Sequence, residues 1–312
     1  MVCKTESVFQ DRWLTTFRAG GGLANPAEQF PKLFGRVDFF VNYPYALATI
    51  VAGTICTTAA LASFIGLSET LQRRGDTKSK ENPPMSTWDV LKAPGVPNVL
   101  FIYGYTMLLA LAYTAVSPVF LFTSIGHGGL QFSPQWISVF LAIAGASQAL
   151  WMLLVFPPLQ NRTSTGFVLR ACAVAWPFMF ASFPIINELL RHGWTTLFWI
   201  LGPISLVIGS GVSMSFACVQ LCLNDVAPSP EVNATLNALA LVVTSGVRAV
   251  APALSTSVFA LGVKRGWIDG HLFWVVLCVL ALALSAILRW LPARAEGDLK
   301  RKSQETDEAE YM

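Results

Sequence analysis

Arg248 is the residue of this sequence best placed to do chemistry, because it lies near the middle of a long apolar segment, residues 235–262. An unpaired arginine at the centre of a membrane-spanning helix costs at least ~2.5–3.5 kcal/mol, so its side chain must face protein or water. In a water-filled cavity the guanidinium would bind an anionic group or take part in proton coupling. The alternative is a packing role, in which Arg248 bonds to neighbouring carbonyls; Ser245, Gly246 and Pro252 nearby indicate a helix irregularity.

Four amide side chains also lie within apolar segments or at their ends: Gln148, Gln220, Asn224 and Asn237. Ser213, Gln220 and Asn224 are spaced by seven and four residues, which places them on one face of a helix. Such groups either line a polar cavity or join helices through hydrogen bonds worth about 0.6 kcal/mol each. We expect the four amides to bind substrate together with Arg248, and helix joining is the alternative.

Seven apolar segments must position these residues. Each has roughly 20 or more residues, the length that a helix needs to cross a ~30 Å hydrocarbon layer. Helices are expected because a backbone in lipid must satisfy its own hydrogen bonds. With 54% hydrophobic and 12% charged residues, the sequence predicts an all-α polytopic membrane protein. The predicted spans are residues 39–67, 98–123, 134–157, 167–187, 195–223, 235–262 and 270–292.

Other chemistries find little support in the sequence. The six cysteines form no CxxC or His/Cys ligand pattern, and buried thiols commonly act as small hydrophobic groups. The three histidines, His127, His192 and His271, lie at segment boundaries, where contact with headgroups is commoner than a zinc site. No nucleophile, acid–base pair or metal cluster recurs at one depth, so no enzyme, cofactor or metal site is predicted. The net charge of +3 is small and its basic residues are scattered, which does not indicate nucleic-acid binding.

The distribution of Lys and Arg orients the spans. Most of these residues flank the side that holds loop 68–97, loop 158–166, loop 224–234 and the C-terminal tail. Since positive charge stays in the cytosol, we expect this side to be cytosolic. The N-terminal segment, residues 1–38, then carries further basic residues on the opposite side without a signal peptide. The simpler explanation is that upstream spans are missing.

The order of the spans gives the domain organisation. We expect a non-membrane segment at 1–38, one transmembrane helix at 39–67, a cytosolic linker at 68–97, a six-helix bundle at 98–293 and a cytosolic tail at 294–312. The linker mixes charges, Ser/Thr and four prolines, a flexible composition. Six closely connected spans behind such a linker indicate half of a twelve-span transporter.

Short motifs carry a resemblance to a known family. Gly20–Pro26 resembles the tail of the glycine/proline antiporter motif that closes helix five in drug:proton antiporters of the major facilitator superfamily. Asn42–Tyr45 and Ser68–Leu71 resemble a fungal branch that is sometimes called zinc-induced-facilitator-like. The C-terminal half matches more specifically, at residues 128–134, 156–162, 209–214, 224–230, 245–248 and 289–292.

The resemblance implies a partial major facilitator fold: helix six plus the C-terminal six-helix bundle, without helices one to five. It implies a secondary active transporter, with proton-coupled efflux of a small organic compound, a secondary metabolite or a xenobiotic. It places Tyr105 and Tyr113 on the cavity-lining equivalent of helix seven. Family members use charges at cytosolic helix ends as gates, here Glu69, Arg162 and Asp225, for which solvated caps are the alternative. The plasma membrane is favoured over the vacuolar membrane.

A transporter of this family builds its substrate cavity between two bundles. One bundle would leave Arg248 and Gln220 facing lipid unless a partner covers them: a second copy, a separately encoded N-terminal half or the missing part of a longer chain. We therefore expect no proton-dependent efflux from the 312-residue chain alone. A non-transporting, truncated remnant is the alternative function. A seven-helix receptor is a weaker one, because no NPxxY motif lies in the last span.

Overall fold

The computed structural model describes residues 26–34, 37–43, 45–66, 86–228 and 232–296. In these ranges every regular element is helical, and seven helical segments are long and apolar enough to cross a membrane. The predicted polytopic all-α fold is therefore confirmed, with boundaries that move by a turn or two. The segments are Ala46–Gly66, Val96–Phe122, Pro134–Arg162, Thr165–Arg191, Thr195–Asp225, Asn233–Arg265 and Leu272–Trp290.

The chain divides into two units, of which the first comprises residues up to 83 together with Ser133–Ala142. It contains α2 (Pro26–Gln29), α3 (Pro31–Phe34), α4 (Asp38–Asn42) and α5 (Ala46–Gly66). Helix α5 has no buried residue, so its apolar side chains are all available to lipid or to another protein surface. The described part of this unit contains none of the residues predicted to bind substrate.

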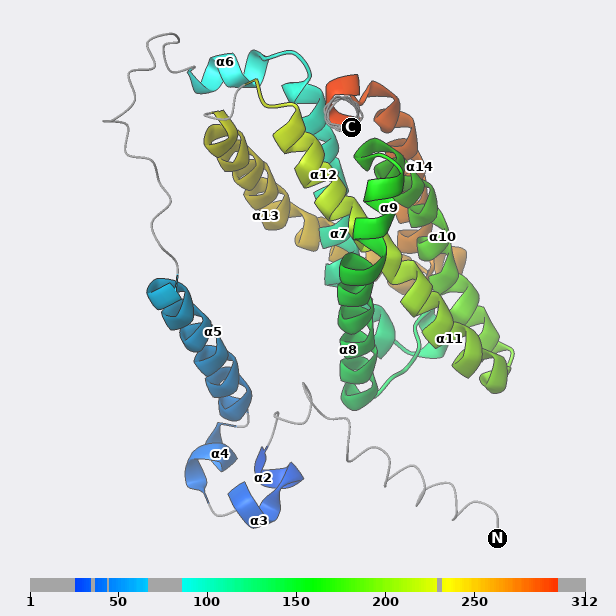
Figure 1. Cartoon of the computed structure of the whole chain (residues 1–312). Coiled ribbons are helices and arrows are strands. Elements are labelled where there is room, and N and C mark those ends of the chain that lie inside the picture. The colour runs from blue at the N-terminus through cyan, green and yellow to red at the C-terminus, as the bar shows by residue number, and fades with distance from the viewer. Residues whose placement is uncertain (1–25, 35–36, 44, 67–85, 229–231, 297–312) are drawn as a thin grey trace. The chain divides into compact units, whose positions relative to one another are not determined.

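The second unit comprises Pro84–Phe132 and the chain from Ile143 onward. Helix α7 (Val96–Phe122) packs along α13 (Asn233–Arg265), and α10 (Thr165–Arg191) packs along α14 (Leu272–Ile287). Helix α12 (Met214–Asp225) contacts both α7 and α10, as Figure 1 shows. In lipid such contacts rest on close packing and on interhelical hydrogen bonds, because lipid tails are as apolar as the side chains.

Aromatic rings fill the centre of this bundle. The rings of Phe183 and Trp274 stack with centroids 4.1 Å apart, joining α10 to α14. Phe120 of α7 meets the ring of Trp274 edge-on at 5.0 Å. Trp176 is buried and lies 5.1 Å from the ring of Phe180. These contacts pack α7, α10 and α14 against one another.

A proline explains one polar contact in this apolar core. Pro177 lies inside α10 and has no N–H to donate to the carbonyl of Ala173, four residues earlier. The hydroxyl of Ser285, on α14, donates to that carbonyl at 3.2 Å. The hydrogen bond that α10 loses is thereby replaced by one to its neighbour.

Two spans are interrupted rather than continuous. Helix α8 (Pro134–Leu150) continues through a π-helical turn, η3 (Trp151–Val155), into α9 (Phe156–Arg162). The prolines at 157 and 158 cannot donate the hydrogen bonds of a regular α-helix, which accounts for a change of pitch at this point. Helix α11 (Thr195–Gly209) similarly passes through a 3-10 turn, η4 (Ser210–Ser213), into α12.

The end of the predicted 68–97 linker is ordered. Residues 67–85, Glu69 included, lie outside the described part of the chain. Helix α6 (Thr87–Lys92) follows, and the backbone N–H of Ser86 donates to Asp89 at 3.3 Å. Val90 and Val96 are completely buried. Between them Gly95 adopts φ +91°, and a Cβ there would lie 3.0 Å from both Pro292 and Val226. Apolar contacts thus hold this segment to the bundle.

Candidate functional site

Helix α13 carries a polar stripe. Asn237, Thr244 and Arg248 are spaced by seven and four residues, so they lie on one face over about three helical turns. Their environments differ along the stripe: Asn237 and Thr244 are half-buried, whereas Arg248 is exposed. The polar side chains of α12 and α7 meet this stripe at its two half-buried positions.

The first of these meetings joins two residues predicted to bind substrate. The side-chain amide of Gln220, on α12, donates to Oδ1 of Asn237 at 2.7 Å. The second meeting joins Thr244 to Tyr103 of α7, with 3.3 Å between the hydroxyl oxygens. Tyr103 is buried, so its hydroxyl depends on this partner. Both pairs link α13 to a neighbouring helix.

Arg248 itself lies on the outside of the described bundle. In the described part of the chain no hydrogen bond or ion pair is formed by its guanidinium. Pro252, four residues later, has no N–H to donate to the carbonyl of Arg248. A charged side chain and a freed carbonyl therefore coincide near the middle of a span.

The remaining predicted substrate residues are dispersed. The hydroxyl of Tyr105 donates to the carbonyl of Leu280 on α14 at 3.0 Å. Tyr113 faces the aromatic core, 5.6 Å from the ring of Phe183. Gln148 is exposed on α8, and Asn224 is half-buried near the end of α12. The structure brings Gln220 and Asn237 together and leaves these four apart, so their binding role stays a prediction.

The predicted gates lie at helix ends. Arg162 is exposed at the end of α9, and Asp225 is half-buried at the end of α12. A pair that was not selected from the sequence lies at this end of the bundle. The side chains of Arg170, on α10, and Glu296, in η8 (Ala293–Glu296), form an ion pair. Ala295 beside Glu296 is completely buried. The ion pair and this contact attach the chain after the last span to α10 and α12.

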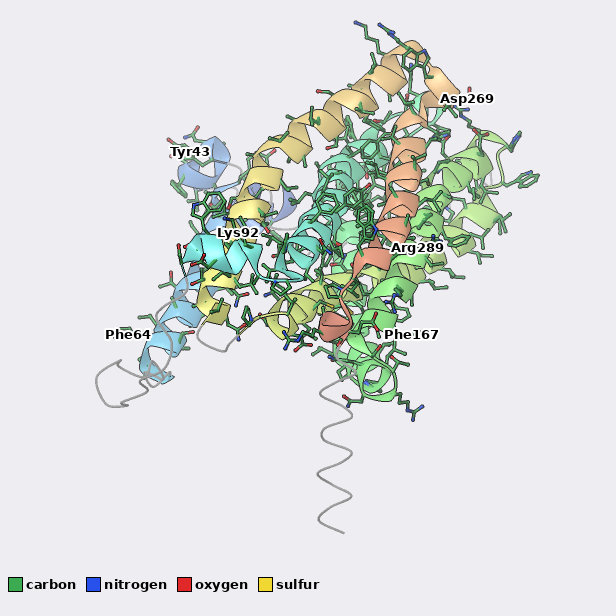
Figure 2. The ribbon with its side chains drawn as sticks, turned by 90° about the horizontal axis from the view of Figure 1, so that it is seen from above. Tyr43, Phe64, Lys92, Phe167, Asp269 and Arg289 are labelled. Atoms are coloured by element: carbon green, nitrogen blue, oxygen red, sulfur yellow. The ribbon has the colours of Figure 1, made fainter. Side chains whose placement is uncertain are left out.

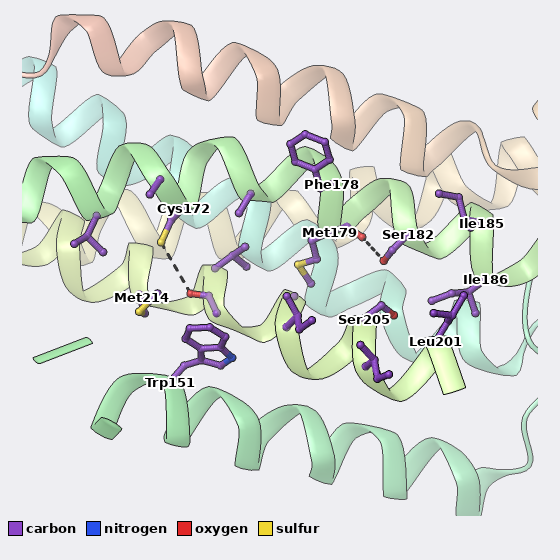
Figure 3. A pocket seen from close by; sticks show the side chains of 18 of the residues that line it. Trp151, Cys172, Phe178, Met179, Ser182, Ile185, Ile186, Leu201, Ser205 and Met214 are labelled. Carbon is purple, nitrogen blue, oxygen red and sulfur yellow. Dashed lines mark hydrogen bonds between the residues drawn. The ribbon is translucent and has the colours of Figure 1, made fainter. Parts of the chain in front are cut away.

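An apolar cavity of about 620 Å³ lies between α10, α11 and η3. Figure 3 shows Trp151 on one side and Cys172 with Met179 on the other. The indole N–H of Trp151 donates to the carbonyl of Val207 at 2.8 Å, which links η3 to α11. The polar groups of the stripe on α13 do not line this cavity.

Sequence reasoning missed a polar cluster at the opposite end of the bundle. Asn187 is completely buried near the end of α10 and donates to the carbonyls of Gly129 at 2.5 Å and Ile125 at 3.2 Å. Arg191, one turn later, donates to the carbonyls of Gly126 at 3.2 Å and Asp269 at 3.0 Å. The signal was an Asn and an Arg four residues apart at the end of an apolar segment, followed by loops rich in glycine.

His271 belongs to the same cluster. The sequence placed it at a headgroup boundary with the other two histidines, whereas the structure buries it at the start of α14. The reason is tertiary: α10 and the turn before α14 close over the ring. No group of three or more possible metal ligands occurs in the part of the chain that the structure describes. His271 therefore has charged neighbours but no arrangement of ligands for zinc.

The described helices define a class, a polytopic all-α membrane protein, and the chain is similar to part of proteins named as transporters. The chain is 44% identical over 280 residues to the efflux pump azaK of Aspergillus niger, covering 89% of this chain and 57% of the pump. It is 23% identical to the major facilitator-type transporter psiT2 of Psilocybe cubensis, covering 91% and 62%. It is 22% identical to the protein ZINC INDUCED FACILITATOR-LIKE 1 of Arabidopsis thaliana, covering 89% and 61%.

These relatives confirm the predicted resemblance to fungal major facilitator transporters. The chain spans about three fifths of the length of each of these three relatives. All three carry names of transporters or facilitators, in agreement with the expectation that the chain is not an enzyme. No protein-family profile matches the chain. No solved structure matches it either.

Proposed function

We propose that this chain forms part of a secondary active transporter that exports a small organic compound, a secondary metabolite or a xenobiotic, in exchange for protons. The similarity to proteins named as an efflux pump and a major facilitator-type transporter supports this proposal. Because the chain spans 57% of the efflux pump, the activity is proposed for an assembly that includes a second set of helices.

The exposed position of Arg248 carries the proposal. A cation facing lipid at the middle of a span costs at least ~2.5–3.5 kcal/mol, and the freed carbonyl of the same residue adds to that cost. Water or a further protein surface over α13 removes the cost. A stripe of polar groups that needs such a cover is what one half of a transport cavity presents.

The groups on the stripe indicate what the cavity would bind. Arg248 would hold an anionic or acceptor group of the substrate, or take part in proton coupling. Gln220 and Asn237 offer amide donors and acceptors, and the hydroxyl of Tyr105 lies on a neighbouring helix.

We assign weaker contributions to Tyr113, Gln148 and Asn224, and gating roles at the cytosolic ends to Glu69, Arg162 and Asp225. The matching surface comes from an N-terminal bundle or from a second copy, and we favour the plasma membrane.

A chimera tests the proposal. The part of the azaK pump that this chain does not cover is fused in front of it, and the chimera is compared with the 312-residue chain in proteoliposomes. We expect the chimera to export organic compounds when a proton gradient is imposed and to stop when a protonophore is added. We expect the 312-residue chain alone to give no export.

Export by the purified short chain as a monomer would overturn the requirement for a second surface. Equal inactivity of a well-folded chimera would favour a non-transporting remnant. The intact azaK pump, reconstituted in the same way, serves as the positive control. Lys264→Leu in the chimera is the matched substitution control, because Lys264 is an exposed cation at the end of the same helix.

A further inference from the structure

Two loops and a helix end are tied together where α13 meets α14. The loops are η2 (Ile125–His127) and η6 (Trp267–Gly270). The backbones of the two loops touch: a Cβ on Gly270 would lie 2.4 Å from the carbonyl oxygen of His127. Asp269 lies in this turn, at the end of α14 opposite Arg289 (Figure 2). We call this arrangement of η2, η6 and the end of α10 the loop cluster.

The backbone of the loop cluster is strained. In the described chain three residues other than glycine have positive φ, and all lie in these loops or next to them: Gln131 at +55°, Ile268 at +51° and Asp269 at +54°. Such conformations cost of order 1–3 kcal/mol each and persist only where surrounding contacts enforce them. The hydrogen bonds from Asn187 and Arg191 to loop carbonyls supply that enforcement. Separation of the loops would release the strain.

His271 lies within the cluster without a hydrogen bond. Its side chain is buried, and neither ring nitrogen has a hydrogen-bond partner in the described chain. Nε2 lies 3.7 Å from Oε1 of Glu188, which is too far for a hydrogen bond. The same Oε1 accepts from Arg191 Nη1 at 3.0 Å. A proton on His271 would therefore compete with Arg191 for one carboxylate oxygen.

The charged groups around His271 come from every element in the cluster. On α10, Glu188 attracts a proton to the ring and Arg191 repels it, while Asp269 of η6 attracts it. His192 contacts the other oxygen of Glu188 at 3.9 Å, and Nδ1 of His127 in η2 pairs with Ser124 at 2.7 Å. Lys264 and Arg265 are exposed at the end of α13. Burial and Arg191 together outweigh the carboxylates and lower the pKa of His271.

We propose that the loop cluster is a proton-controlled latch, in which His271 takes up a proton when η2 and η6 separate from the end of α10. In the closed cluster the ring stays neutral. In the open cluster water solvates the ring, so the imidazolium forms more easily. The ligand of this site is the proton, and the site does not depend on transport by the chain.

The sign of the pH effect follows from these two states. The closed state binds the proton more weakly than the open state, so its stability is greatest above the ordinary imidazole pKa of about 6.5. The closed state is lost progressively as pH falls from that value towards the lower pKa of buried His271. For each unit by which the two pKa values differ, the opening constant rises by up to about tenfold.

Histidine titration tests the proposal directly. The chain has three histidines, so spectra of ring-labelled protein in nanodiscs are assigned by substituting His127→Gln and His192→Gln one at a time. We expect the resonance that survives both substitutions, that of His271, to titrate below the ordinary value of about 6.5. Titration at or above that value would overturn the latch. Glu188→Gln removes an attracting carboxylate and should lower the pKa of His271 further.

Thiol labelling measures loop opening. Leu130 is buried three residues after the end of η2, whereas Gly126 is exposed with open space where a Cβ would be added. The maleimide labelling rate of Leu130→Cys is divided by that of Gly126→Cys at each pH, with the labelling of the native cysteines subtracted. This ratio removes the pH dependence of the thiol itself. We expect the ratio to rise several-fold, or up to about tenfold per unit of pKa difference, between about pH 8 and about pH 5.

The substitution of His271 decides between the latch and general acid loosening. In His271→Gln the labelling ratio should stay flat with pH, whereas in His192→Gln and His127→Gln it should rise as in the parent chain. A rise in His271→Gln equal to that of the parent would overturn the proposal. If the glutamine variant does not fold, His271→Asn is used in its place. If neither variant folds, the titration of His271 in the unsubstituted chain decides.

Discussion

The stripe on α13 and the loop cluster each contain an arginine, and the two differ in what surrounds the guanidinium. Arg191 has partners from three elements: it donates to the carbonyls of Gly126 and Asp269 and forms an ion pair with Glu188 at 3.0 Å. Arg248 is exposed in the middle of a span. The loop cluster is thus complete within this chain, whereas the stripe requires water or another surface. The contacts of Arg191 indicate a structural role, whereas a functional role of Arg248 stays a prediction.

The loop cluster should lie on the opposite side of the membrane from segment 68–97 and the C-terminal tail, and labelling tests this with an all-or-none outcome. Lys78→Cys and Ser303→Cys lie in segments predicted to be cytosolic from their positive charge. In intact cells an impermeant maleimide should label Gly126→Cys of the loop cluster and should label the other two only after permeabilisation. Labelling of position 78 or 303 from outside would reverse the orientation of both regions.

Substitution of Arg248 should affect transport and leave folding intact. In the chimera, Arg248→Leu should abolish export because the cavity loses its cation, while membrane abundance stays unchanged. Arg248→Lys keeps a charge but not the planar guanidinium, so export should be altered and retained. The measurement is efflux per molecule of protein at the membrane. Full activity of Arg248→Leu would reduce Arg248 to a packing role and would end the contrast with Arg191.

Substitution of Arg191 should have the opposite profile. Arg191→Ala leaves several loop carbonyls and Glu188 without their donor, but the carbonyls of Gly126 and Asp269 are exposed and water can replace it. We expect a loss of stability of about 1 kcal/mol, the net value of a typical hydrogen bond. Thermal unfolding followed by a thiol-reactive dye is the assay, because Cys172, Cys218 and Cys222 are buried. Arg248→Ala, the matched control, should unfold at the parent temperature.

The pair Gln220 and Asn237 should give the smallest effect. Interhelical hydrogen bonds in membranes contribute about 0.6 kcal/mol on average, so a double-mutant cycle with Gln220→Leu and Asn237→Leu should give a coupling energy of this order. In the chimera the same substitutions should weaken export more than they weaken folding. A coupling of several kcal/mol with unchanged export would make the pair a structural link and would limit the functional stripe to Arg248.

Much of the fold was predictable because lipid imposes simple rules. The spans follow from the length of the apolar segments. In lipid the backbone cannot bond to water, and a helix satisfies its backbone hydrogen bonds within one segment. The ordered end of the 68–97 segment was missed, because its prolines and charges conceal the contacts that Val90 and Val96 make with the bundle. The interruptions at η3 and η4 were also missed as elements, although prolines follow η3 and glycines lie at η4.

The candidate site was predictable in part. The position of Arg248 within an apolar segment was sufficient to select it, since a cation at the middle of a span is costly unless protein or water surrounds it. The contact between Gln220 and Asn237 required the structure, because the side chains come from different helices. The loop cluster was missed because Asn187, Arg191 and His271 lie far apart in the sequence and have ordinary residue types for helix ends.

The sequence by itself determined the membrane class, the seven spans and the resemblance to fungal transporters, and it selected Arg248 as a candidate. Each depends on local composition or on short motifs, which a single chain displays without folding. Only the tertiary structure decided that His271 is buried, that strained loops meet above α10, and that Arg248 lies on the surface of the bundle. Burial and strain are properties of elements packed against one another, and no spacing along one helix encodes them.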